Sequence, residues 1–269
     1  MNTHLPSYST RLKAMHEALC TELTAMVKAV PLKETDCILD AGCGDGFYTE
    51  RLTDRLGPDG SLIAFDSSTE YLHLARERMQ SKQIAPSILF QLGNVEAMPF
   101  DAASFDVVWC AHSMQSFVDP RKALCELRRI LKPGGTLAIV ETDNMHGMIL
   151  PWPMGLELAV LPAEEKSLQQ HSSRDGLYFL RFAERYLSEC GFRELRRTTY
   201  AIDRPTPFDE AFRRYLTIYL ADLYHSAEPY LSEDQRTAAA NFLLPSSPQF
   251  VAIQDATCVT MIHGLVLAR

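Results

Sequence analysis

The sequence has no long apolar run. Of its 269 residues, 46% are hydrophobic and 22% are charged, and no stretch approaches the roughly 18 consecutive apolar residues that a membrane-spanning helix needs. The first residues, MNTHLPSYSTRLKAMHEAL, show no basic segment followed by an apolar block, so no secretory signal is predicted. We expect a cytoplasmic protein without a membrane span, long enough to bury a sizeable core.

Paired cysteines are also missing. The seven cysteines are odd in number, scattered along the chain and without a C-x-x-C pair. This spacing argues against a disulfide framework and against a structural zinc site. We therefore expect no metal, and cysteines that are mostly small, buried and reduced.

Positive charge is scarce as well. The chain has 26 lysines and arginines against 34 aspartates and glutamates, which gives a net charge of −8. Proteins that bind nucleic acids usually carry a positive field toward the phosphates. The short basic clusters RRILK and RELRR are more typical of the solvated side of a helix or an edge strand. No nucleic-acid partner is expected.

The sequence does contain a regular alternation of short β-type runs and helix-length segments between residues 35 and 142. The apolar runs are CILDA, SLIAFD, SILFQLG, FDVVWCA and GTLAIVE, and the intervening segments predict helices over 47–56, 68–83 and 119–131. Asp119-Pro120 supplies an N-cap and a proline at the first helical position. Apolar strands separated by helices are typical of a parallel sheet covered on both faces. The pattern predicts an α/β fold with a doubly wound, Rossmann-like core.

The flanking segments predict additions to this core. Leu12, Met15, Leu19, Leu23 and Met26 are spaced as in one amphipathic helix over 10–30, within a helical cap at 1–34. Three prolines make 143–174 an inserted loop with a short helix. Residues 175–269 complete a seven-stranded, mostly parallel sheet, with a helix at 175–190, strands FRELRRTTYAID and TCVTMIHGLVLA, and an aromatic helical insertion at 207–243.

Three glycines stand in the turn after the first strand, in DAGCGDG. That turn lies at the carboxyl edge of a parallel sheet, where such sheets bind their ligands. The first two glycines allow a tight bend and close approach of a ligand, and the third allows close packing as the helix begins. Their G-x-G-x-G spacing differs from the G-x-G-x-x-G of a dinucleotide turn, which disfavours a nicotinamide-dependent oxidoreductase. Asp66 ends the second strand, where a carboxylate can bind both hydroxyls of a ribose.

Further motifs follow the glycine turn in order. They are FDSSTEYLHLARERM, GNVEAMPFDAASFDVVWC, SFVDP and LRRILKPGGTLAIVE. Together with LDAGCGDG, they resemble the class I S-adenosylmethionine-dependent methyltransferases, and within these the small-molecule group of ubiquinone and menaquinone biosynthesis enzymes. The resemblance covers about residues 36–142. It implies S-adenosylmethionine as cofactor, S-adenosylhomocysteine as product, and methyl transfer as the reaction.

The resemblance also implies a cofactor site at the strand ends, formed by Asp40, Gly42, Cys43, Gly44, Asp66, Ser67, Asn94, Val95, Cys110 and Gln115. Asp40 and the backbone of 42–44 would hold the methionine end, Asp66 the ribose, and Ser67 would lie beside the adenine. Asn94 stands where the family usually has aspartate. Its side-chain oxygen and the Val95 N–H would meet the adenine. Cys110 would lie near the amino-acid moiety, and Gln115 replaces a common histidine.

Several of these residues have a simpler interpretation. Asp40 and Asp66 could be turn formers, although acids at the ends of two consecutive core strands favour a ligand. Asn94 could equally serve a Gly-Asn turn. Cys43 and Cys110 are expected to be spectators, because no histidine or lysine is visibly partnered with them.

A catalytic base is needed only if the acceptor carries a proton. His112 is the favoured residue because it follows the fourth strand at the carboxyl edge of the sheet. The other histidines and tyrosines considered are His146, His171, Tyr178, Tyr200, Tyr215, Tyr219 and His225. Core packing with one satisfied hydrogen bond is the usual role of such side chains.

The sequence thus predicts a methyltransferase for a small-molecule acceptor. The N-terminal helix, 143–174 and 207–243 could roof the pocket over a small or medium, partly apolar acceptor. The aromatic helices could equally form the interface of a homodimer. The alternatives are a protein that binds the cofactor or a partner without turnover, and an enzyme that methylates RNA or protein.

Overall fold

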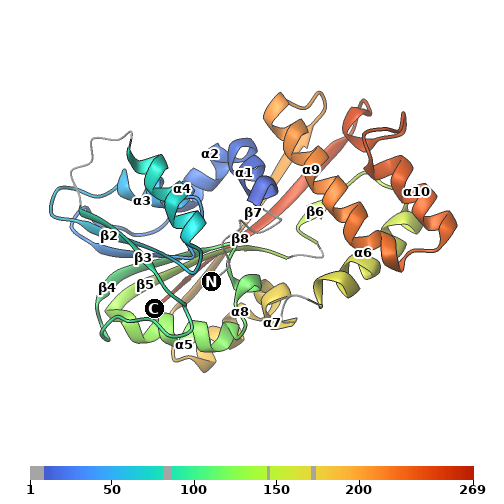
Figure 1. Cartoon of the computed structure of the whole chain (residues 1–269). Coiled ribbons are helices and arrows are strands. Elements are labelled where there is room, and N and C mark those ends of the chain that lie inside the picture. Colours follow the sequence, from blue (N-terminus) through green and yellow to red (C-terminus); the bar gives the residue numbers. More distant parts are fainter. Residues whose placement is uncertain (1–8, 81–86, 144–145, 171–173) are drawn as a thin grey trace.

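A computed structural model describes residues 9–80, 87–143, 146–170 and 174–269 (Figure 1). Its central sheet contains five parallel strands in the order β3-β2-β1-β4-β5. They are β1 (Cys37–Ala41), β2 (Ser61–Asp66), β3 (Ser87–Leu92), β4 (Phe105–Ala111) and β5 (Leu131–Thr142). Each apolar run therefore forms the strand that its sequence predicts, and the α/β fold with a mostly parallel sheet is confirmed.

The sheet is completed by antiparallel strands from the second half of the chain. β8 (Cys258–Ala268) pairs with β5 on one side and with β7 (Leu195–Pro205) on the other. A two-residue strand, β6 (Met148–Ile149), also pairs with β8. The sheet therefore has eight strands, one more than the seven predicted. The sequence did not indicate β6, because two residues are too few to show a strand pattern.

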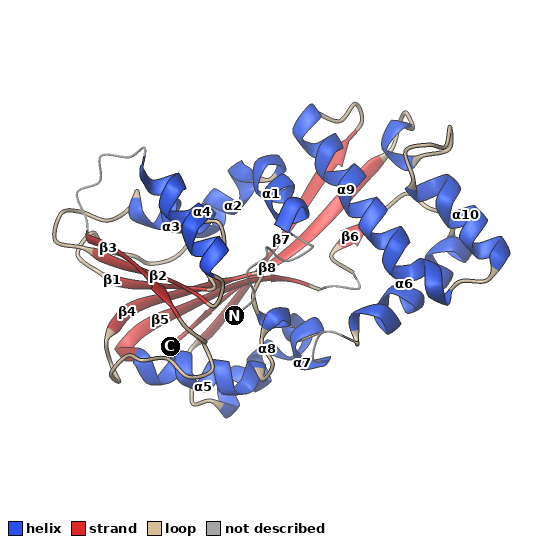
Figure 2. Ribbon diagram, viewed as in Figure 1, coloured by secondary structure: helices blue, strands red, loops and turns tan. Residues whose placement is uncertain are grey.

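Helices cover both faces of the sheet (Figure 2). Helices α1 (Ser9–Ala18), α2 (Cys20–Lys28), α3 (Phe47–Thr53) and α4 (Thr69–Gln80) share one buried cluster with the sheet. Helices α5 (Pro120–Ile130) and α8 (Phe179–Glu189) form the other. The predicted N-cap of α5 is present, since the Asp119 carboxylate accepts a hydrogen bond from the Lys122 N–H at 3.0 Å. The doubly wound prediction is therefore confirmed.

Two predicted helices are each divided in the structure. The helix predicted over 10–30 breaks at Leu19 into α1 and α2, and the helix predicted over 175–190 breaks at Tyr178 into α7 (Arg174–Leu177) and α8. Leu19 and Tyr178 have non-helical backbones and are buried. Tertiary packing overrides the local periodicity at both breaks. The predicted helix over 68–83 is observed to Gln80, and its last residues lie outside the described ranges.

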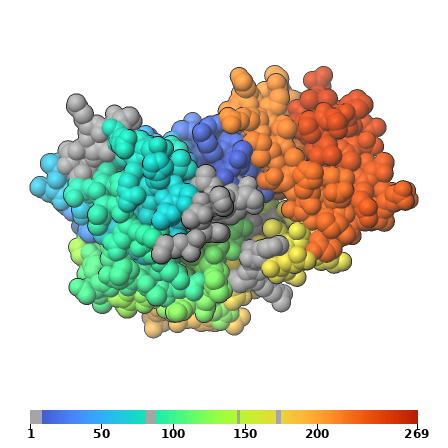
Figure 3. All heavy atoms as spheres, viewed as in Figure 1, coloured from blue at the N-terminus to red at the C-terminus, as the bar shows by residue number. Residues whose placement is uncertain are grey.

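The inserted segments form a helical group at one end of the molecule (Figure 3, yellow for Met154–Leu168 and orange to red for 207–243). Helix α6 (Met154–Leu168) is longer than the short helix predicted for 143–174, because its buried side chains pack against α9 despite Pro162. The aromatic insertion forms α9 (Glu210–Ala227) and α10 (Glu233–Leu243), joined by the short turn Glu228–Tyr230. Helix α9 packs against α1, α6 and α10.

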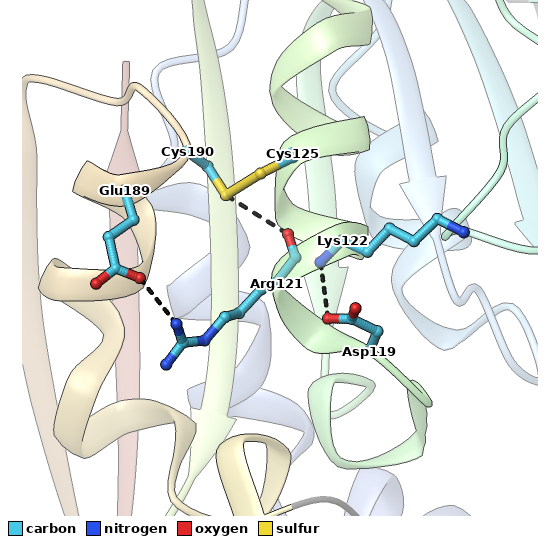
Figure 4. The surroundings of a disulfide bond; sticks show 6 residues. All are labelled: Asp119, Arg121, Lys122, Cys125, Glu189 and Cys190. Carbon is cyan, nitrogen blue, oxygen red and sulfur yellow. Dashed lines mark hydrogen bonds and ion pairs between the residues drawn. A yellow bond between two sulfur atoms is a disulfide. The ribbon is translucent and has the colours of Figure 1, made fainter.

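One disulfide corrects the expectation that the cysteines are reduced. Cys125 of α5 and Cys190 at the end of α8 are bonded, although 65 residues separate them in the sequence (Figure 4). The packing of α5 beside α8 brings them together, which cysteine spacing alone cannot indicate. Cys43 and Cys110 are free and buried, as predicted, whereas Cys20 and Cys258 are free and exposed.

The described residues 9–80, 87–143, 146–170 and 174–269 bear on two expected absences. Among the helices of this part of the chain, none combines the length and the apolar character that crossing a membrane requires. Its histidine, cysteine and acidic side chains also form no group of three or more suited to a metal ion.

Candidate functional site

A cleft of about 320 Å³ lies at the carboxyl edge of the parallel strands. Its walls are the turns after β1, β2 and β3 and the segment after β4, and Leu12 of α1 also contributes. The predicted residues that line it are Gly42, Gly44, Asp66, Ser67, Asn94, Val95 and His112. The topology therefore brings together residues from four separate stretches of sequence.

Asp66 links the first two turns of the cleft. Its Oδ2 accepts a hydrogen bond from the Gly44 N–H at 2.9 Å, and its Oδ1 accepts one from the Ser68 N–H at 2.9 Å. Burial raises the pKa of Asp66, while these backbone donors oppose the shift. Each carboxylate oxygen keeps a lone pair for a further donor. The carboxylate is therefore fixed in place and can still accept from a ribose.

The three glycines of the first turn all have left-handed backbones, with φ of 76° at Gly42, 53° at Gly44 and 80° at Gly46. A Cβ on Gly46 would lie 2.9 Å from the Ala75 Cα, so the third glycine serves helix packing, as predicted. A Cβ on Gly44 would meet nothing within 4 Å. Since Gly44 also lines the cleft, it leaves open space for a ligand beside the main chain.

Asp40 lies beneath the cleft and not among its lining residues. Its side chain is buried at the end of β1, where Oδ2 accepts a hydrogen bond from Thr49 Oγ1 at 2.6 Å. Burial raises the pKa of Asp40 to about 7. A cation bound nearby would favour its ionised form. Asp40 can therefore act on a ligand through its charge.

The backbone donors implied for the methionine end are already used inside the chain. The N–H groups of Gly42 and Cys43 both donate to the Phe65 carbonyl, at 2.8 and 3.1 Å. The Cys43 side chain is buried, and burial raises the pKa of its thiol well above the usual range. Cys43 is therefore a structural residue, as the spectator interpretation predicted.

Asn94 and Val95 occupy the place predicted for the adenine end. Asn94 Oδ1 accepts a hydrogen bond from the Glu96 N–H at 2.9 Å, which is the turn contact of the simpler interpretation. The Asn94 side chain nevertheless lines the cleft, and Val95 is buried against it. The two interpretations of Asn94 are therefore compatible.

Like Asp40 and Cys43, two further implied cofactor residues do not line the cleft. Cys110 is fully buried in the core, and Gln115 lies in the short helix Met114–Ser116 without facing the cleft. Strand β4 continues to Ala111, and the chain turns sharply at His112, which has a φ of 50°. This turn places other residues of the segment in the wall instead, namely Ala111, Ser113, Ser116, Phe117 and Val118.

His112 lines the cleft as predicted. Its Nδ1 lies 3.4 Å from the Tyr48 hydroxyl, and its Nε2 lies 3.4 Å from Nδ1 of His263. Burial lowers the pKa of His112 well below its usual range, and His263 and His16 add to the effect. His112 is therefore a neutral imidazole at neutral pH, with neighbours at both ring nitrogens.

The other proposed bases do not reach the cleft. Of these, His146, Tyr178, Tyr200, Tyr215, Tyr219 and His225 are absent from its lining. His171 lies outside the described residues. Among the segments predicted to roof the pocket, α1 contributes Leu12, whereas the described parts of α6, α9 and α10 contribute no lining residue.

Glu141 is a buried residue beside the site that the sequence analysis missed. Its Oε1 accepts hydrogen bonds from the N–H groups of Ser113 and Met114, each at 2.8 Å. This contact holds the segment that follows β4, and burial raises the pKa of Glu141 to about 7. The sequence did contain a signal for Glu141, because this residue follows the apolar run of β5. Asp40 and Asp66 stand in the same way at the ends of the apolar runs of β1 and β2. Tyr71 of α4 also lines the cleft and carried no such signal.

The cleft suits a nucleoside that carries positive charge. It offers Asp66 to a ribose and open space at Gly44, with the buried carboxyl groups of Asp40 and Glu141 at neighbouring strand ends. Its described lining includes no lysine or arginine. A phosphate-bearing dinucleotide would lack a cationic partner there. S-adenosylmethionine, which has a ribose and a positive sulfonium, fits these residues.

Comparison with known proteins gives the same result from sequence. Residues 39–139 match the family described as "Methyltransferase domain". A "Probable methyltransferase ltbC" from Aspergillus luteorubrus is 34% identical over 153 residues, covering 54% of this chain and 53% of the relative. A "Demethylmenaquinone methyltransferase" from Lactococcus lactis is 36% identical over 107 residues, covering 40% and 42%. The matches therefore span about half the length of these curated relatives.

Solved structures share the fold over most of the chain. A putative methyltransferase from Bacillus halodurans aligns with a TM-score of 0.58 at 19% identity, covering 93% of this chain and 98% of the other. The phosphoethanolamine N-methyltransferase 2 of Haemonchus contortus, solved with phosphomonomethylethanolamine and S-adenosylhomocysteine, aligns at 0.59 and 19% identity, covering 98% and 58%. At 19% sequence identity, these two similarities show a shared fold and nothing further.

The fold and the cleft define a Rossmann-like methyltransferase architecture. The family match and the homologues make residues 39–139 a class I S-adenosylmethionine-dependent methyltransferase domain, which resembles the enzymes of menaquinone and ubiquinone biosynthesis. S-adenosylmethionine is the cofactor of this class.

Proposed function

We propose that the protein transfers the methyl group of S-adenosylmethionine to a small-molecule acceptor by in-line displacement. The observation that carries this proposal is the pairing of Asp66 with Gly44, because it combines a fixed carboxylate with empty space beside the main chain. In this proposal Asp66 binds the ribose, Ser67, Asn94 and Val95 surround the adenine, and Asp40 and Glu141 supply negative charge toward the methionine end.

The chain contributes mainly positioning to this reaction. When bound, the cofactor supplies a methyl group already activated by a positive sulfur. The protein then has to hold an acceptor in line with the methyl group and exclude water, and such positioning supplies much of the rate. Leu12 of α1 and the turn at His112 lie on the cleft wall and would limit access.

A small acceptor is supported by the charge of the site. The described lining of the cleft contains no cationic side chain. RNA would require a basic groove. The names of a demethylmenaquinone methyltransferase and a phosphoethanolamine N-methyltransferase among the similar proteins also denote small acceptors.

Binding without turnover is the second candidate. It is favoured by the weak basicity of His112, whose two ring nitrogens already face Tyr48 and His263. A protein of this kind would bind S-adenosylmethionine without consuming it.

The deciding experiment is a methyl-transfer screen. The full chain is incubated with S-adenosylmethionine and a panel of phenols, acidic carbon compounds, amines and thiols, with bulk RNA and a peptide mixture as separate arms. S-adenosylhomocysteine is measured by mass spectrometry, and Asp66→Asn is the matched control. We expect product with at least one small acceptor. Cofactor binding without product in any arm would support the second candidate, and product only with RNA or peptides would contradict the small-molecule proposal.

A further inference from the structure

A strained backbone at His112 marks a cluster of buried polar side chains. In the described part of the chain, positive φ in residues other than glycine occurs only at Ala103, His112 and Ala256. His112 is the one of these that lines the cleft. Its N–H still donates to the Val140 carbonyl at 2.8 Å, so the strain turns the residue without losing this backbone hydrogen bond. A strained backbone conformation persists only where the surrounding structure enforces it, and such residues cluster at functional sites.

The ring of His112 is held between Tyr48 of α3 and His263 of β8. Both partners are buried, with exposed fractions of 5% and 2%. The rings of His112 and His263 meet edge to face, with centroids 5.5 Å apart. Burying two imidazole rings in a core costs free energy unless their polar nitrogens find hydrogen-bond partners. Packing alone would be better served by apolar side chains.

The contacts of His112 fit one tautomer. A buried tyrosine hydroxyl usually donates its proton, and His112 Nδ1 is the partner that faces Tyr48. With Nδ1 as the acceptor, the proton of neutral His112 is on Nε2. In that tautomer the Nε2–H can donate to Nδ1 of His263, which lies 3.4 Å away. The nitrogen that carries the proton is set by the bond that the other nitrogen makes.

Burial keeps the histidine pair neutral. Burial lowers the pKa of His263 to about 4, and Glu22 of α2 opposes this shift. Glu22 is in turn paired with Arg204 of β7 at 2.5 Å. On the other side, His16 acts on His112, and Asp40, Glu141, Asp45 and Arg51 act on Tyr48. A neutral pair adds no positive charge beside a cationic cofactor.

We propose that His263 is a positioning residue that fixes His112 with its proton on Nε2, so that Nδ1 takes a proton from the methyl acceptor. This inference rests on the proposed methyl transfer and deepens it, because it requires an acceptor that loses a proton: a hydroxyl, an acidic carbon or an N–H group. The long contact to Tyr48 is the one that an acceptor would replace.

The proton and electron balance of this step is complete. The acceptor forms the bond to the methyl carbon with a lone pair on oxygen or nitrogen or, for an acidic carbon, with the electron pair of its C–H bond. The electron pair of the broken carbon–sulfur bond stays on sulfur, and the acceptor's proton moves to Nδ1 of His112. The positive charge thus passes from the sulfonium to the imidazole. His263 stabilises that charge by accepting from the Nε2–H of His112.

The first test needs no acceptor. Protein labelled with ¹⁵N-histidine is studied by long-range ¹H–¹⁵N correlation, with signals assigned from variants of each histidine. We expect wild-type His112 to be protonated on Nε2. In His263→Leu this single tautomer is lost, because the Nε2–H has no acceptor and the Tyr48 hydroxyl can instead accept from an Nδ1–H. In His263→Asn it is retained, because the amide oxygen stands near the place of Nδ1. His73→Leu, an exposed position on α4, is the control. Protonation of wild-type His112 on Nδ1 would overturn the inference.

The second test uses an acceptor from the screen. We expect His263→Leu to lower kcat at least about tenfold, to alter its pH profile and to leave the KM for S-adenosylmethionine unchanged, while His263→Asn restores most of the rate. Wild-type kcat and pH profile in His263→Leu, or turnover with a thioether alone, would overturn the proposal. Absence of S-adenosylhomocysteine in every arm would instead reject the proposed function. The tautomer measurement would still test whether His263 keeps the proton of His112 on Nε2.

Discussion

At the residue scale, alanine variants of Gly44 and Gly134 distinguish the effect of backbone strain from the effect of ligand contact. Gly134, at the turn within β5, has the same left-handed backbone and also has no atom within 4 Å of a Cβ. Alanine at either site should cost about 1 kcal/mol of folding free energy through strain. Only Gly44→Ala places its methyl group in the cleft, so we expect it alone to weaken S-adenosylmethionine binding, by roughly tenfold. Thermal unfolding and calorimetry of both variants check this, and equal affinities would mean that the turn faces away from the cofactor.

Asp66 gives a second prediction at this scale. Charge-assisted hydrogen bonds contribute about 1.5–3 kcal/mol, so Asp66→Asn should weaken cofactor binding roughly 10- to 100-fold. Asp101→Asn, at a turn away from the cleft, is the matched control. Calorimetric titration measures both. If a folded Asp66→Asn protein binds as tightly as wild type, the ribose assignment is wrong.

The sequence predicted these residues better than it predicted their neighbours. Asp66, Gly42 and Gly44 line the cleft, because a strand end and a tight turn leave local signals. Cys110 and Gln115 do not line it, because the exact residue at which β4 ends depends on the turn at His112. His263 left no signal, since only the pairing of β8 with β5 brings it to His112 across 151 residues.

At the element scale, the disulfide joins α5 to α8 on one face of the sheet. The neighbouring ion pairs of Arg121 with Asp175 and Glu189, at 3.0 and 3.1 Å, are exposed and contribute little. Loss of the bond should therefore lower stability by about 2–4 kcal/mol. Thermal unfolding with and without dithiothreitol measures this change.

Two variants control the disulfide experiment. Cys125→Ser should reproduce the loss and make the protein insensitive to dithiothreitol. Cys258→Ser removes an exposed free thiol and should behave as wild type. An oxidised wild-type protein whose unfolding is unchanged by the reductant would show that this link does not stabilise the fold.

Element identities were predicted more reliably than element boundaries and additions. The apolar runs of β1, β2 and β4 are buried on both sides, so their sequences are unambiguous. Leu19 and Tyr178, at the two breaks, are buried, and Tyr178 contacts α6. Local periodicity does not record such packing. The length of α6 depends on its burial against α9, which the prolines of 143–174 concealed.

At the scale of the whole molecule, buried carboxyl groups make stability depend on pH. Glu164 of α6 is buried, its Oε2 has no hydrogen-bond partner among the described residues, and burial raises its pKa from 4.5 to about 7. The folded state therefore holds this proton more tightly than the unfolded state. The resulting stability is fully present below pH 4.5 and is lost as the pH rises to about 7.

Glu164→Gln removes this dependence. Its stability relative to wild type should rise between pH 5 and pH 8, by about 2 kcal/mol. Chemical unfolding at both pH values measures the difference, and Glu157→Gln serves as the control for removing one carboxylate from the same helix. A difference that stays constant with pH would show that Glu164 does not hold a proton in the folded state.

The most direct test of the cofactor cleft is calorimetric titration of the wild-type protein with S-adenosylmethionine, with S-adenosylhomocysteine, and with NADH as control. We predict one site for each of the first two ligands and no heat of binding from NADH, because the cleft offers a carboxylate to a ribose and no cation to a phosphate. Binding of NADH, or silence from both adenosyl compounds, would contradict the account.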